Sequence, residues 1–252
     1  MMSTKSLFLC FLLCLAAAPL RSDVLWDRAV QIYEANSNLL PGRIEIRLTE
    51  YGGRNRRVRN EEHGVYRTLL GDDGSPEVEI LRVIRNGEDI TDERRSDNGG
   101  GGGFASLFGP PQGSDVPDDD DEGGGFGGPG ESSPFDPDLQ HLVSYSRNSE
   151  SRLINGRRTA AFSFRQQSAD DPDQFVTGTA WLDMTSGAPL LVESTLDPLP
   201  SRFLNTFLFR SHFAERSDGW YLTRLDVDVV AQILLVRREF ESVITFSEHF
   251  RN

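Results

Sequence analysis

Histidines and alternating carboxylates are the side chains of this sequence with the chemistry for proton transfer or metal binding. Asp226 and Asp228 alternate along one predicted strand, as acidic residues commonly do on a solvated strand face. The sequence contains no G-x-S-x-G elbow, phosphate-binding loop or dinucleotide fingerprint. The histidines form no HxH or HExxH spacing; they are His63, His141, His212 and His249. We therefore expect no catalytic residue, metal site or cofactor, and a hydrolase built on acidic residues is the weakest alternative.

Cysteines and a run of acidic residues could also bind metal. Both cysteines, Cys10 and Cys14, lie in an apolar N-terminal run, so the rest of the chain has no disulfide and no thiolate. Residues 118–123 read like the start of a calcium loop. Its twelfth position is Pro129, where a bidentate glutamate is required. The run is interpreted as solubilising charge, with weak cation binding as the alternative.

The N-terminal segment has the layout of a secretory signal peptide. Lys5 precedes the apolar run SLFLCFLLCLAAAPL, and the small and polar residues RSD follow it. We expect cleavage after Ser22 and a periplasmic protein. An uncleaved membrane anchor and lipidation at Cys10 or Cys14 are the alternatives.

The elements that must position any site are mostly strands. Apolar spacing predicts one amphipathic helix, with Asp23 as N-cap and Pro41-Gly42 as its stop. Alternating residues, as in GRIEIRLTEY, predict strands from Arg43 to Ile90 and again from residue 139 to the C-terminus. We predict a mainly β (α+β) fold. About ten strands form a single strongly curved antiparallel sheet, an incomplete β-barrel packed by the N-terminal helix.

Residues 96–138 interrupt this pattern. They hold ten acidic and no basic side chains, and 13 of the 24 glycines of the chain. Such a composition cannot bury enough apolar surface to offset the entropy of ordering it. We predict a disordered insertion within a single domain of residues 23–252. The net charge of −13 also argues against nucleic acid as a partner.

Phenylalanines dominate the strands after the insertion. One helix cannot cover the whole apolar face of a large curved sheet, so the surplus forms either an ordinary core or a cavity for an apolar ligand. The residues alone favour an ordinary core.

The segment VTGTAWLDMTSGAPLLVESTLDPLP shifts this balance, because it resembles the LolA/LolB-like lipoprotein-carrier superfamily. In that family a strand that ends in Asp precedes a Thr-x-Gly-x-Pro-Leu hairpin, here Asp183, Thr185, Gly187, Pro189 and Leu190. The N-terminal helix before the first strand fits as well. The resemblance implies a bent, incomplete antiparallel barrel whose apolar cavity takes acyl chains of lipids or lipoproteins, and a carrier or sensor without enzyme activity.

We therefore expect an exported carrier or sensor that holds an acyl chain of a lipid or lipoprotein, with an envelope membrane protein as a further partner. The expected cavity lining is Phe162, Phe164, Trp181, Phe207, Phe209 and Phe240, with Trp220 near the mouth. The insertion stands where the resembled family has lid helices, and Phe104, Leu107 and Phe108 are its candidate flexible lid. The alternative is a non-enzymatic periplasmic protein-interaction module with a fully packed sheet.

Overall fold

The computed structural model describes residues 23–53, 55–72, 74–97, 133–169, 171–199, 201–216, 219–233 and 236–252. The predicted signal peptide, Cys10, Cys14 and the candidate lid residues Phe104, Leu107 and Phe108 lie outside the described residues. The described elements are, in chain order, α2 (Val24–Ala35), β1 (Leu39–Leu40), β2 (Arg43–Gly52), β3 (Arg57–Leu70), β4 (Pro76–Arg85), β5 (Glu88–Asp89), α3 (Thr91–Asp97), the 3-10 turn η2 (Gln140–Leu142), β6 (Val143–Arg147), β7 (Leu153–Ile154), β8 (Arg157–Gln167), β9 (Phe175–Asp183), β10 (Pro189–Asp197), β11 (Leu204–Arg216), β12 (Gly219–Ile233), β13 (Val236–Ser247) and β14 (Phe250–Arg251).

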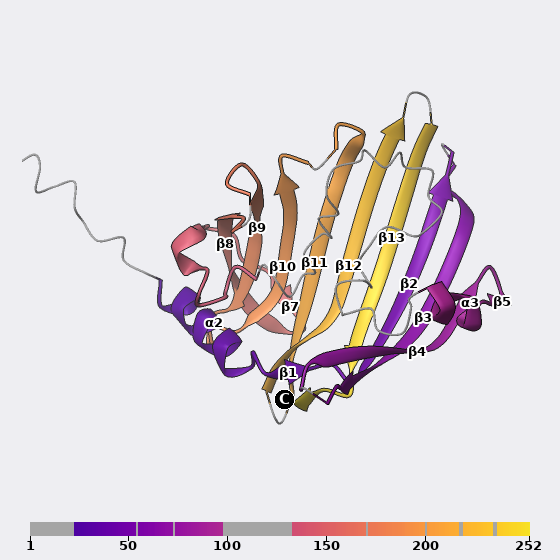
Figure 1. Cartoon of the computed structure of the whole chain (residues 1–252). Helices are drawn as coiled ribbons and strands as arrows, with labels where there is room; N and C mark the ends of the chain where they lie inside the picture. The colour runs from indigo at the N-terminus through magenta and orange to yellow at the C-terminus, as the bar shows by residue number, and fades with distance from the viewer. Residues whose placement is uncertain are drawn as a thin grey trace, which may run out of the picture.

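One large antiparallel sheet forms the body of the molecule (Figure 1). Its strand order is β5-β4-β3-β2-β13-β12-β11-β10-β9-β8-β6, with β7 paired to β8. Strand β2 thus pairs with β13, close to the other end of the chain, and the strands on either side of the insertion lie at opposite edges. A separate two-stranded sheet pairs β1 with β14. The sheet is not closed, because β5 and β6 do not pair with each other. The predicted fold class is confirmed in that the fold is mainly β, with one large antiparallel sheet that is not closed into a barrel and a helix at the N-terminus.

The strand registers divide the side chains between two faces of the sheet. Helix α2 packs on the face that carries Phe162, Phe164 and Ala180. Following the pairings from strand to strand, this face also carries Phe209 of β11 and Val227 of β12. We call it the inner face, and the opposite one the outer face. Because side chains alternate along a strand, the register assigns every regular strand residue to one face.

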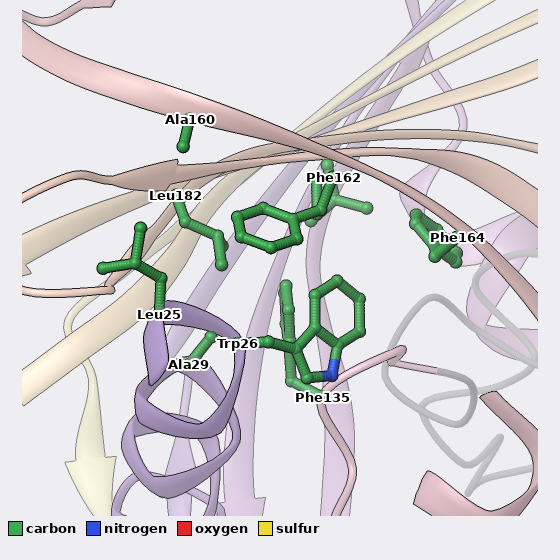
Figure 2. Packing of buried hydrophobic residues seen from close by; sticks show 10 residues of the cluster. Leu25, Trp26, Ala29, Phe135, Ala160, Phe162, Phe164 and Leu182 are labelled. Atoms are coloured by element: carbon green, nitrogen blue, oxygen red, sulfur yellow. The ribbon is translucent and has the colours of Figure 1, made fainter. Parts of the chain in front are cut away.

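Helix α2 is anchored on the inner face by Trp26. The Asp23 carboxylate caps the helix by accepting from the Leu25 amide. Trp26 is 1% exposed and stacks on Tyr145 at 4.2 Å between ring centroids, and its indole N–H donates to Gln140. Figure 2 shows Leu25 and Trp26 pointing from the helix toward Phe162 and Leu182 of the sheet. Burying a side chain of this size is worth several kcal/mol, about 3–5 by truncation.

The structure corrects two predicted boundaries. Helix α2 ends at Ala35, before the predicted stop, because Asn36 caps it with its own side chain and backbone. The ends of the predicted insertion are ordered as well. Ser96 lies in α3, and Phe135 is fully buried at 5.0 Å from the Trp26 ring. Composition marked residues 133–138 as disordered because Phe135 is the only large apolar side chain among them.

Helix α3 covers the other end of the inner face. Arg94 of α3 donates to Glu62 of β3, which also pairs with Arg85 of β4. Arg95 donates to the carbonyl oxygens of Ile80 and Leu81, so it satisfies part of the exposed edge of β4. Beside it, Ile80, Val83 and Ile90 belong to a second buried cluster with residues of β2, β12 and β13. In Figure 1, α2 and α3 lie at opposite ends of the sheet.

Candidate functional site

The hairpin between β9 and β10 explains how α2 is held in place. The Asp183 carboxylate accepts from the amides of Thr185 and Ser186 at 2.7 and 2.9 Å. Gly187 has φ +79°, a conformation that L side chains rarely adopt. A Cβ at Gly187 would lie 2.6 Å from Arg28 Cβ and 3.0 Å from the Leu25 carbonyl oxygen, so glycine lets the helix approach. The hairpin from Asp183 to Leu190, on which the resemblance rests, is therefore the part of the sheet against which α2 packs closely.

Asp183 is held ionised in this hairpin. It is 5% exposed, and this burial by itself raises its pKa. The amide N–H groups of Ser186 and Thr185, together with Arg157, favour the charged form, and the net pKa lies below the usual value. Asp183 therefore has a structural role, which is to stabilise the turn between β9 and β10.

Apolar side chains run in rows across the middle of the inner face. In one row Phe207 of β11, Val229 of β12 and Phe240 of β13 are direct partners. In the next row, Phe209 is opposite Val227, and Leu48 of β2 follows beyond Ser242. We call the following set the inner strip: Ile46, Leu48, Phe207, Phe209, Val227, Val229 and Phe240.

The inner strip has a closed end and an open end. Toward the N-terminus of β2, Ile44, Leu225 and Ile244 are at most 2% exposed. Toward the other end of the same strands, Leu48, Val229 and Phe240 are only half-buried. Phe207 is an exception at 8% exposed, since it packs edge-on against Phe209 at 4.6 Å. The inner-face residues of β2, β12 and β13 are therefore more deeply buried at one end of the strip than at the other.

No residue of the inner strip belongs to the cluster that packs around helix α2. Helix α2 packs on residues of β8, β9 and β10, and α3 packs beside β4. In Figure 1 the strands β2 and β11–β13 run between the two helices. Half-buried Val, Leu and Phe side chains on adjacent strands thus form one apolar surface, and this is the candidate site.

The structure places the seven predicted lining residues in four different locations. Phe207, Phe209 and Phe240 lie together in the inner strip. Phe162 and Phe164 share its face but are buried beneath α2, where they contact Trp26. Trp181 is on the outer face, where its indole N–H donates to Glu193 and Arg152 lies 3.8 Å above its ring. Trp220 is far along β12, and its indole donates to the Pro189 carbonyl.

Four residues of the strip are not among the predicted lining residues: Ile46, Leu48, Val227 and Val229. Ile46 and Leu48 alternate in the stretch GRIEIRLTEY, and this spacing predicts that they share one face of a strand. Their neighbours, however, are Ile244 and Ser242, almost 200 residues later. A period of two fixes which residues share a face, but it does not tell which distant strand pairs alongside. The alternation in WYLTRLDVDVV was the available signal for Val227 and Val229.

The outer face of the same strands is charged, in contrast to the strip. Arg210 pairs with Asp228 at 2.5 Å, and Asp226 accepts from Arg224 at 2.7 Å and lies 3.1 Å from His212. Asp226 and Asp228, predicted to lie on a solvated strand face, thus each form an ion pair with an arginine, as is common on a strand face in water. The two faces of β11–β13 therefore differ sharply in polarity.

Other features of the described residues do not form a site. Within the described ranges, no group of three or more His, Cys, Asp or Glu side chains could hold a metal ion. Two polar hollows, of about 550 Å3 beside α3 and about 470 Å3 at the β3–β4 turn, contain no residue of the inner strip. Among the described helices, none has the length and apolar character needed to cross a bilayer.

Comparison with known proteins finds similarity in solved structures alone. No protein-family model and no curated protein matches the sequence. A DUF1329 family protein from Desulfovibrio piger is 12% identical with a TM-score of 0.38, covering 90% of this chain and 92% of that one. A putative outer membrane lipoprotein-sorting protein domain from Vibrio parahaemolyticus is 10% identical, TM-score 0.38, with 90% and 93% covered. A LolA superfamily protein from Nitrosomonas europaea is 13% identical, TM-score 0.38, with 90% and 92% covered.

LolA superfamily proteins are thus among the structural neighbours, as the hairpin motif predicted. At these TM-scores the similarity carries no argument about ligand or activity. The function must be inferred from the chain's own inner face.

Proposed function

We propose that this protein is a non-enzymatic binding protein that holds an apolar chain, such as the acyl chain of a lipid or lipoprotein, against the inner strip. The observation that supports this most strongly is the row of Phe207, Val229 and Phe240 on adjacent strands, between two helices that cover only the ends of the sheet. Each CH2 group moved from water onto such a surface contributes about 0.8 kcal/mol. Burial alone is sufficient for binding, and no catalytic group is needed.

We further propose that the protein acts outside the cytoplasm. The sequence pattern of the apolar N-terminal run supports export, and an acyl chain carrier is useful where lipids must cross an aqueous compartment. Cell fractionation of the full-length chain tests this: recovery in the periplasmic fraction with residues 1–22 removed is expected. Recovery in the cytoplasm at full mass would contradict it.

Displacement of a fluorescent alkyl probe tests the binding proposal. Val229 and Val230 are consecutive in β12, both half-buried, and they point to the inner and outer face respectively. Val229→Glu places a carboxylate in the strip and is expected to weaken probe binding by roughly tenfold or more. Val230→Glu adds the same charge on the charged outer face and is expected to leave binding near the wild-type value.

Equal loss in both variants would contradict the proposal, because a general effect on the sheet would then explain it. Absence of any probe binding by the wild-type chain would also contradict it. A concentration-dependent dimer that Val229→Glu abolishes, with no probe bound, would assign the strip to a second copy of the chain.

A further inference from the structure

The open end of the inner strip is bordered by charged side chains. In the row of Phe207, Val229 and Phe240, the next partner is Glu50 of β2, followed by Asn60 of β3. Arg238 precedes Phe240 by two residues and therefore lies on the same face. Arg238 and Glu50 form an ion pair whose side chains are 35% and 20% exposed. A ligand in the strip would meet these groups where it reaches solvent.

A second arginine reaches the same place. A register shift between Glu50 and Tyr51 leaves Arg59 as the extra residue of β3. Its side chain lies across Gly52, where a Cβ would overlap it, and Gly52 is the direct partner of Arg238. Among the described residues Arg59 makes no ion pair, unlike Arg238. We call Arg59, Arg238, Glu50 and Asn60 the rim.

The rim carries a net positive charge, since two guanidinium groups face one carboxylate. Guanidinium groups bind carboxylate and phosphate oxygens through paired hydrogen bonds, and the Asn60 amide offers further donors. By contrast, the arginines on the outer face of β11 and β12, Arg210 and Arg224, are each paired with an aspartate. The rim therefore combines excess positive charge with an adjacent apolar surface.

We infer that the ligand is an anionic amphiphile. Its apolar chain lies over Phe207, Val229 and Phe240 and extends toward the buried end at Leu225 and Ile244. Its anionic group sits at the open end, against Arg238 and Arg59. This inference rests on the proposed function and adds the charge of the ligand and its direction in the strip. The direction follows from the burial, because the apolar end of an amphiphile is favoured at the less solvated end.

The test compares three probes of equal chain length on the full-length protein: dodecanoate, dodecanol and dodecylammonium. Dodecanoate is expected to bind roughly tenfold more tightly than dodecanol, with dodecylammonium the weakest. Arg59→Gln and Arg238→Gln are expected to remove most of the preference for dodecanoate while leaving dodecanol affinity unchanged. Arg59 is exposed and unpaired within the described residues, so its variant tests the rim without disturbing the fold.

Two further variants sharpen the result. Glu50→Gln releases Arg238 from its partner and is expected to tighten dodecanoate binding by roughly threefold. Arg237→Gln is the matched control, because Arg237 is the chain neighbour of Arg238 and pairs with Glu239 instead. Its dodecanoate affinity is expected to equal that of the wild type.

Equal affinity for dodecanoate and dodecanol would overturn the inference and leave the proposed function standing. Loss of dodecanol binding in Arg59→Gln to the same extent as dodecanoate would overturn it as well. Failure of all three probes to bind would remove the proposed function together with the inference.

Discussion

At the scale of single residues, Asp183 shows how one carboxylate supports the whole architecture. It bonds two amides of its own turn and pairs with Arg157, while Gly187 in the same turn admits α2. The lowered pKa of Asp183 means that its ionised form is favoured in the folded chain. Ionisation of Asp183 is thereby linked to the stability of the fold.

Asp183→Asn is expected to lower the free energy of unfolding by about 1–2 kcal/mol at pH 7. Because the folded pKa is depressed, the stabilisation is present above the unfolded pKa, about 3.9. It is lost as the pH falls through the folded pKa. The stability difference between wild type and variant should therefore shrink below about pH 4. Urea unfolding across pH 3–7 measures it, and a constant difference over this range would contradict the assignment.

At the scale of elements, two glycine variants distinguish the stability effect of the close contact between α2 and the β9–β10 hairpin from the effect of the strained turn itself. Gly187 and Gly156 have similar positive φ angles, +79° and +77°, but the site of a Cβ is open at Gly156 and occupied by α2 at Gly187. Gly156→Ala is expected to lower the free energy of unfolding by about 1 kcal/mol, because alanine is strained in the left-handed conformation. Gly187→Ala is expected to cost about 1–3 kcal/mol more, because the helix must shift.

Chemical unfolding of the two variants measures the contrast between them. Tryptophan fluorescence adds a local readout, since Trp26 is buried in the helix contact. A shifted emission maximum is expected for Gly187→Ala and an unchanged one for Gly156→Ala. Equal costs in both variants would show that α2 does not depend on this approach.

Element identity was largely predictable from the sequence, and element contacts were not. Alternation predicted β2, β12 and β13, and the Asp23 cap predicted the start of α2. Helix α3 was missed because its seven residues, TDERRSD, carry no apolar stripe, and its position depends on Arg94 and Arg95 binding the sheet. Phe135 was assigned to the insertion by composition, although the pocket formed by Trp26 and its neighbours orders it.

At the scale of the whole molecule, the sheet is large enough to expose an apolar face that two helices cover only in part. The sequence predicted this fold class because most of its strands alternate regularly. It could not predict the site in full, because Phe207, Phe240 and Leu48 meet only through pairings between distant segments. Trp181 was predicted to line the cavity but lies on the outer face, next in the chain to the inner-face residue Ala180. Neighbouring residues of a strand point to opposite faces, so an error of one residue reverses the assignment.

Photolabelling tests whether the inner strip is the binding surface for an apolar chain. The full-length chain is irradiated with an alkyl probe that carries a diazirine in its chain, and the modified residues are mapped by peptide mass spectrometry. Labels are expected on inner-face residues of β11–β13, above all Phe207, Val229 and Phe240, and an excess of dodecanoate should remove them. Labels confined to outer-face residues such as Val230 and Val243, or labels that dodecanoate does not displace, would rule out the inner strip as the binding surface.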